Sequence, residues 1–133
     1  MPEREITDFR ITEAVRFIKS NFDRDLDFTD LAKTLNLSAS RLRYLFKEQT
    51  GVPFRKYLRQ ERMKRARRLL ETSFLSVKET ARQSGITDTS HFVKDFKKEF
   101  GLPPAKYRKR YHSSGDKQLP ERESEQKTKQ NLK

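Results

Sequence analysis

The chain contains no cysteine and only four glycines, and its two histidines, His91 and His112, lie far apart. The absence of cysteine excludes disulfides, thiolate metal sites and a cysteine nucleophile, and it suits a reducing cytosol. No H-x-x-H pair, Gly-rich phosphate loop or G-x-S-x-G motif is present, so we expect neither an enzyme nor a bound cofactor or metal. No apolar run is long enough to span a membrane, and the first residues lack the pattern of a signal peptide.

Positive charge is what the chain has in excess. Its net charge is +12, and residues 41–111 carry 20 Lys and Arg against 7 acidic residues, whereas residues 1–40 carry 6 against 8. Such a local excess favours a polyanionic partner. A solvated basic surface would give the same composition, so charge alone leaves both interpretations open.

The chain repeats itself once. Residues 32–57 and 81–107 carry the same residue types in the same order, with one insertion in the second copy. A repeat at fixed spacing predicts one structural unit used twice. The matched pairs are Ala32 with Ala81, Ser40 with Ser90, Phe46-Lys47 with Phe96-Lys97, Gly51 with Gly101, Pro53 with Pro103 and Tyr57 with Tyr107.

Hydrophobic spacing and helix-end signals predict an all-α fold of about seven helices. We expect Asp27, Ser38 and either Thr87 or Asp88 to cap helix N-termini, and Gly51 to end a helix in the left-handed conformation. The expected helices are 11–22, 28–36, 39–49, 54–72, a short one opened by the capping box of Ser76 and Glu79, then 89–99 and 104–110.

The same signals divide the chain into two helix-turn-helix lobes joined by a long linker helix. An N-terminal extension covers 1–9, and the folded part, 10–111, contains lobe one at about 10–52, the linker helix at about 54–72 and lobe two at about 76–111. From residue 112 onward the periodicity is lost and too few apolar residues remain to offset ordering entropy, so we expect 112–133 to be a disordered tail.

The helices 39–49 and 89–99 have outer faces suited to DNA. In the first, Leu42, Leu45 and Phe46 share the side that must face the core, and the opposite side is polar, cationic and carries one aromatic ring. Any surface helix has a polar face, but here a short helix and a tight turn precede it, and the arrangement occurs twice. A helix-turn-helix places its second helix in the major groove, where such side chains reach base edges and phosphates.

The spacing of the copies predicts how one chain uses both helices. A linker helix of 19 residues spans roughly 28 Å, the same order as the distance of about 34 Å between successive major grooves on one face of DNA. We therefore expect a monomeric DNA-binding unit with two recognition helices in adjacent major grooves. Because the copies differ, the site is expected to be asymmetric.

The segments 30–58, 62–70 and 85–108 together resemble the AraC/XylS family of bacterial transcriptional regulators, and the resemblance covers about 10–111. It implies a seven-helix, two-lobed DNA-binding domain that binds double-stranded DNA and recruits or positions RNA polymerase. It also implies a transcriptional regulator of the activator type in the bacterial cytoplasm, at the nucleoid.

By motif position, the resemblance implies base contacts from Ser40, Arg41, Arg43, Tyr44, Thr89, Ser90, His91 and Lys94. We expect phosphate contacts from Ser38, Lys47, Arg55, Thr87, Lys97 and Lys98. The sequence departs from the family where Lys94 stands in place of a frequent Arg, because a bidentate guanidinium fork becomes a point charge. Asp95 is acidic and is expected at the inner edge of its helix.

Two other functions stay open from the sequence. One is a sequence-independent architectural protein that binds DNA or RNA through phosphates alone, and the other is a module whose basic face meets an acidic protein. Only about ten residues precede the first expected helix, so we expect either a stand-alone regulator without a sensor domain or the C-terminal domain of a longer chain.

Overall fold

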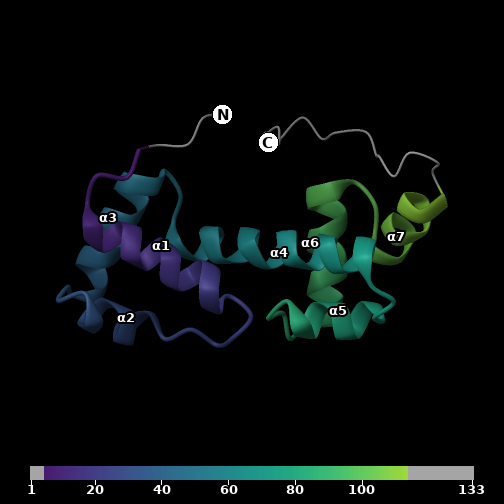
Figure 1. Cartoon of the computed structure of the whole chain (residues 1–133), viewed down its shortest axis with the longest axis horizontal. Coiled ribbons are helices and arrows are strands. Elements are labelled where there is room, and N and C mark those ends of the chain that lie inside the picture. The colour runs from purple at the N-terminus through teal and green to yellow at the C-terminus, as the bar shows by residue number, and fades with distance from the viewer. Residues whose placement is uncertain (1–4, 114–133) are drawn as a thin grey trace. The chain divides into compact units, whose positions relative to one another are not determined.

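The computed structural model of the protein describes residues 5–113, which form seven α-helices and no strand (Figure 1). The all-α fold predicted from the sequence is confirmed. No helix among these residues is both long and apolar enough to cross a membrane. The helices are α1 (Phe9–Asn21), α2 (Phe28–Thr34), α3 (Ala39–Thr50), α4 (Phe54–Thr72), α5 (Val77–Gln83), α6 (Thr89–Phe100) and α7 (Pro104–Ser113).

Contacts divide the chain between Arg62 and Met63, within α4, into what we call the first unit and the second unit. The N-terminal part of α4 packs on the core of the first unit through Phe54, Tyr57 and Leu58, and its C-terminal part supplies buried residues to the second unit. The linker helix expected from the sequence therefore belongs to both cores.

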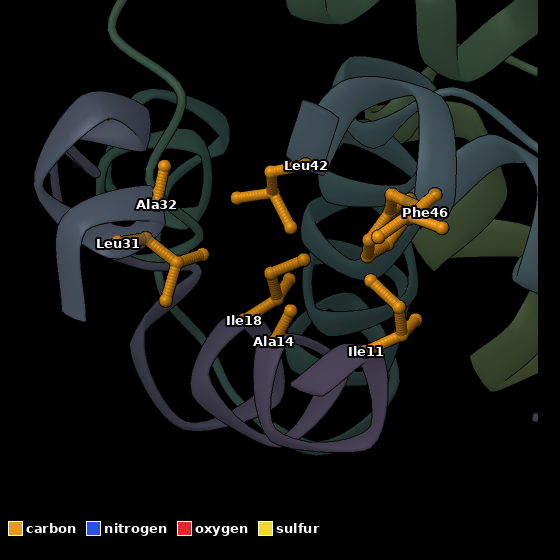
Figure 2. Packing of buried hydrophobic residues seen from close by; sticks show 8 residues of the cluster. Ile11, Ala14, Ile18, Leu31, Ala32, Leu42 and Phe46 are labelled. Carbon is orange, nitrogen blue, oxygen red and sulfur yellow. The ribbon is translucent and has the colours of Figure 1, made fainter. Parts of the chain in front are cut away.

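The core of the first unit is built by α1, α2 and α3, whose buried side chains point toward one another (Figure 2). The ring of Phe46 is fully buried and packs edge-on against Tyr57, with centroids 5.4 Å apart. Burial of such side chains is the main term holding a small helical unit together, at roughly 1.5–3 kcal/mol each. The buried residues are Ile11, Ala14, Ile18, Leu31, Ala32, Leu42, Leu45 and Phe46.

The second unit repeats this arrangement around Phe96, which is fully buried and packs edge-on against Tyr107 at the same 5.4 Å. The hydroxyl of Tyr107 donates a hydrogen bond to the carboxylate of Glu71 on α4. Burial, followed by that bond, raises the pKa of Tyr107 above its usual value. The buried apolar residues are Met63, Ala66, Leu70, Ala81, Phe92, Phe96 and Tyr107.

The structural repeat is longer than the sequence repeat that predicts it. In α1 the fully buried residues Ile11, Ala14 and Ile18 follow spacings of three and four, and in α4 Met63, Ala66 and Leu70 follow the same spacings. The C-terminal half of α4 thus supplies to the second unit the kind of helix that α1 supplies to the first. The residue types differ enough to hide this match when letters alone are compared.

The turns between the paired helices have the same hydrogen bond. Leu37 N–H donates to the carbonyl of Ala32 at 2.8 Å, and Ile86 N–H donates to that of Ala81 at 2.9 Å. The turn needs a positive φ, which Asn36 supplies in the first unit (61°) and Gly85 in the second (87°). Asparagine and glycine are the residues that tolerate this region.

Most predicted helix ends lie within two residues of the observed ones, and the two outermost ends move the limits of the folded part. The first helix begins at Phe9, inside the expected N-terminal extension, because Asp8 caps it. The last helix runs through His112 to Ser113, so the expectation that the tail starts at 112 is wrong at its first two residues. Tyr111 packs against the core of the second unit and stacks on Tyr107 at 6.2 Å, which extends the helix by a turn. The rest of the expected tail, 114–133, lies outside the described residues.

Candidate nucleic-acid interface

Helix α3 has well-defined ends. The hydroxyl of Ser38 accepts from Arg41 N–H at 3.1 Å, and Gly51 ends the helix at φ 88°, as the sequence predicts. With Leu42, Leu45 and Phe46 buried, the opposite side lies in solvent. We call that side the α3 outer face, and it consists of Ser40, Arg41, Arg43, Tyr44 and Lys47, all exposed.

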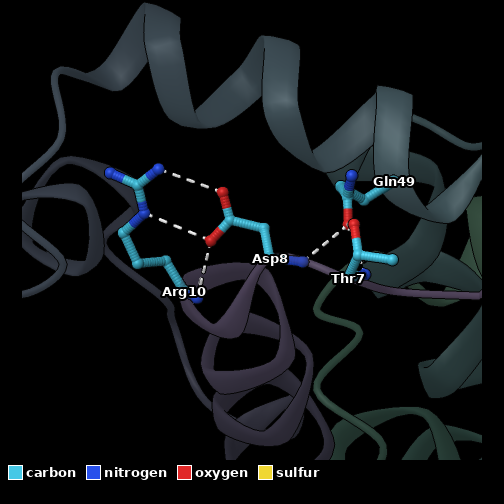
Figure 3. Close-up of polar contacts among 4 residues, drawn as sticks. All are labelled: Thr7, Asp8, Arg10 and Gln49. Carbon is cyan, nitrogen blue, oxygen red and sulfur yellow. Dashed lines mark hydrogen bonds and ion pairs between the residues drawn. The ribbon is translucent and has the colours of Figure 1, made fainter.

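The C-terminal end of α3 is tied to the start of α1 by a side chain that sequence reasoning missed (Figure 3). Gln49 Oε1 accepts from Thr7 N–H at 2.7 Å and from Asp8 N–H at 2.9 Å. Asp8 in turn accepts from Arg10 N–H at 2.9 Å and forms an ion pair with its guanidinium, and these bonds hold the pKa of Asp8 below its usual value. These contacts fix α3 against α1 through residues that lie 41 or 42 positions apart in the sequence.

Two arginines of the α3 outer face lie against aromatic rings. The guanidinium of Arg41 lies 5.6 Å from the ring centre of Tyr44, and that of Arg43 lies 5.2 Å from the ring centre of Phe28 on α2. The face also borders an open hollow of about 490 Å³. The hollow is lined by Ser40, Arg43, Tyr44, Lys47, Glu48 and Gly51, so it brings together four of the residues predicted to contact DNA.

Helix α6 has a different N-terminal cap. Of the two candidates, Asp88 makes the cap, and its carboxylate accepts from His91 N–H at 3.0 Å. The inserted residue of the second copy is therefore Thr87, between the turn and the cap. The α6 outer face is formed by Ser90, His91, Lys94, Lys97 and Lys98, which are all exposed, whereas Thr89 is half-buried. Asp95 is half-buried, in keeping with its expected place at the inner edge.

The caps give the two helices different N-terminal charge. A helix N-terminus attracts phosphate through its free N–H groups and its dipole. At α3 the cap, Ser38, is neutral, whereas at α6 the carboxylate of Asp88 already occupies this position. Thr87, a predicted phosphate contact, is exposed but lies beside that carboxylate. The N-terminus of α3 therefore has the more positive potential of the two.

Not all cations of α4 are available to a partner. Arg62 donates from Nε to the carbonyl of Phe22 at 2.7 Å and from a terminal nitrogen to that of Arg24 at 2.9 Å, and burial lowers its pKa. Arg65 is also half-buried, whereas the predicted phosphate contact Arg55 is exposed at the start of the helix. The guanidinium of Arg62 is bonded to the α1–α2 loop. Fewer cations of α4 can therefore bind an anion than its composition suggests.

A site for metal ions is not found among residues 5–113, which contain no cluster of three His, Asp or Glu side chains that could hold one. The chemistry that these residues offer is hydrogen-bond donation and positive charge on two capped helices. Each follows a short helix and a tight turn, as in a helix-turn-helix.

The sequence model of a protein family described as a helix-turn-helix domain matches residues 31–110. The chain belongs to the AraC/XylS-type helix-turn-helix family. Members of this family similar to the chain include the Msm operon regulatory protein of Streptococcus mutans, 38% identical over 99 residues, which are 74% of this chain and 36% of that protein. The lactose operon transcription activator of Staphylococcus xylosus is 34% identical over 104 residues, 78% of this chain and 37% of that protein. The chain thus spans little more than a third of the length of these curated relatives.

Solved structures of AraC-type domains have the same fold. The C-terminal domain of AraT, a response regulator from Geobacillus stearothermophilus, matches with a TM-score of 0.74 at 29% identity, over 81% of this chain and 90% of that one. The DNA-binding domain of AdpA, a global transcriptional factor solved in complex with a target DNA, matches with a TM-score of 0.73 at 29% identity, over 78% of this chain and 94% of that one. The chain is therefore an AraC-type DNA-binding domain, and the predicted family is confirmed.

Proposed function

We propose that the chain binds an asymmetric promoter site by placing α3 and α6 in adjacent major grooves of double-stranded DNA. The observation that carries the proposal is a pair of helix-turn-helix units with the same turn bond and the same glycine C-cap but different outer faces. The α3 outer face carries two arginines and a tyrosine, and the α6 outer face carries serine, histidine and lysines. Identical scaffolds with different side chains favour two different half-sites.

Base contacts are assigned to the residues named from the sequence. In the first unit these are Ser40, Arg41, Arg43 and Tyr44, and in the second they are Thr89, Ser90, His91 and Lys94. The exposure of all but the half-buried Thr89 supports this assignment. Phosphate contacts are assigned to Ser38, Lys47, Arg55, Thr87, Lys97 and Lys98, all of which are exposed.

The domain acts in transcription, as the names of its relatives indicate. We infer that it positions RNA polymerase at a promoter in the bacterial cytoplasm and that the DNA-binding unit is a monomer. The two units within one chain support the last point, because one chain then supplies both recognition helices.

Selection of bound duplexes from a random pool tests the proposal. We expect two different half-motifs about one helical turn, or 10–10.5 base pairs, apart, and a preference over random DNA of at least about 10³-fold. Enrichment without a motif would favour a sequence-independent architectural protein. Failure to bind any duplex at low salt would favour a module that meets an acidic protein.

A further inference from the structure

A continuous set of aromatic contacts leads from the core of the first unit to the α3 outer face. Phe46, fully buried, meets Phe54 edge-on at 5.7 Å, and Phe54 meets Phe28 at 4.3 Å. The guanidinium of Arg43 lies over the ring of Phe28, 5.2 Å from the ring centre. Phe28 is the first residue of α2 and packs against the core of the unit. The exposed Arg43 therefore lies on a ring that the core holds in place.

This contact leaves Arg43 free to recognise a base. When a guanidinium stacks on a ring, its flat face makes the contact. Its five N–H donors lie along its edge and stay available for hydrogen bonds. The contact also limits the rotamers of a long side chain before DNA binds, so less conformational entropy is lost on binding. An arginine held in this way is suited to donate two hydrogen bonds to O6 and N7 of guanine.

The second unit has no such pair. By the register of the repeat, Phe28 corresponds to Val77 and Arg43 to Val93, and both valines are half-buried. The first unit therefore carries a cation and its aromatic support where the second carries two aliphatic side chains. The pair is a feature of this one half-site and not of the shared scaffold.

We propose that Phe28 is a positioning residue that sets the base preference of Arg43 without contacting DNA. This inference rests on the proposed function, because it assumes that Arg43 reads a base. It assigns to α2, the supporting helix of the motif, a part in sequence discrimination. The interaction requires an aromatic face at position 28 and a planar guanidinium at position 43.

The test compares F28L, F28Y and the matched control F9L, which removes an exposed ring from α1. For each variant, Kd is measured on the selected site and on sites substituted at the base pair whose preference R43A abolishes. We expect F28L to reduce that preference about threefold, the size of an exposed cation–π contact, and F28Y and F9L to retain it. In the R43A background, F28L should not weaken binding to the selected site any further.

A measurement on the free protein complements the binding data. We expect the Arg43 side-chain protons to carry a ring-current shift that F28L removes and that F28Y and F9L keep, while thermal melts confirm that each variant is folded. An unchanged preference in F28L, or an equal loss of affinity for the selected site when F28L is added to wild type and to R43A, overturns the inference alone. A wild-type chain that selects no motif overturns the proposed function and the inference together.

Discussion

In the proposed binding mode, the side chains of the outer faces decide which bases the domain prefers, and this can be tested one residue at a time. We predict that R43A and K94A weaken binding to the selected site by about 1–3 kcal/mol and binding to random duplex by much less. The loss should be larger for R43A, because arginine can form a bidentate contact and lysine acts as a point charge. Titrations of both DNAs by fluorescence anisotropy measure this. Equal losses of affinity for the two DNAs would mean that these residues contact phosphates and not bases.

The cap of α6 gives a prediction of opposite sign. D88N keeps a good N-cap but removes a negative charge from the helix end that the proposed binding mode places nearest to a phosphate. We expect tighter binding to any duplex by about 1 kcal/mol, the interaction of two unit charges near 4 Å in water, and a steeper dependence on salt.

The matched control is E13Q on α1, which makes the same change in net charge. Glu13 belongs to neither outer face, and it is half-buried and paired with Arg16 on α1. Equal effects of E13Q and D88N would mean that net charge alone is responsible. No change in D88N would place the N-terminus of α6 away from the DNA backbone.

At the scale of the element, the contacts of Gln49 make α3 depend on the segment before α1. We predict that Q49L lowers the free energy of unfolding by about 1 kcal/mol, since two backbone N–H groups lose a partially exposed acceptor. Q49E keeps an acceptor at that position and should be closer to the wild type. Urea unfolding followed by circular dichroism measures both. An unchanged stability in Q49L would show that water replaces the amide at no cost.

The ion pair of Asp8 adds a dependence on pH. The pKa of Asp8 is lowered in the folded protein by hydrogen bonds from Arg10. The Asp8 carboxylate therefore stabilises the folded protein fully above the unfolded pKa of about 3.9. This stabilisation is lost as the pH falls through the pKa of the folded state. We expect NMR titration to show that R10A raises the pKa of Asp8 toward its usual value. A pKa unchanged by R10A would assign the shift to other groups.

Elements with local signals could be predicted from the sequence, and long-range contacts could not. Ser38 and Gly51 act as caps because of their own chemistry and their immediate neighbours, so the bounds of α3 follow from its sequence. The contact of Gln49 with Thr7, or of Arg43 with Phe28, depends on how separate helices pack. The extension of α7 to Ser113 depends in the same way on Tyr111 packing against the core.

At the scale of the whole molecule, a single helix, α4, contributes residues to both cores. Met63, Ala66 and Leu70 of α4 repeat the buried spacing of α1, so each unit has its own first helix, helix-turn-helix and closing helix. The sequence repeat predicted two units but not this sharing, because the matched residues differ in type. In the proposed binding mode, the two units have the same scaffold and different outer faces, and each reads one half of the target separately.

This central claim is tested most directly by repeating the random-pool selection with two variants. One, R43A/Y44A, alters the α3 outer face, and the other, S90A/K94A, alters that of α6. All four residues are exposed and lie outside both buried cores. We expect each variant to lose one half-motif and to retain the other unchanged. A palindromic wild-type motif, or equal weakening of both halves by either variant, would contradict the account.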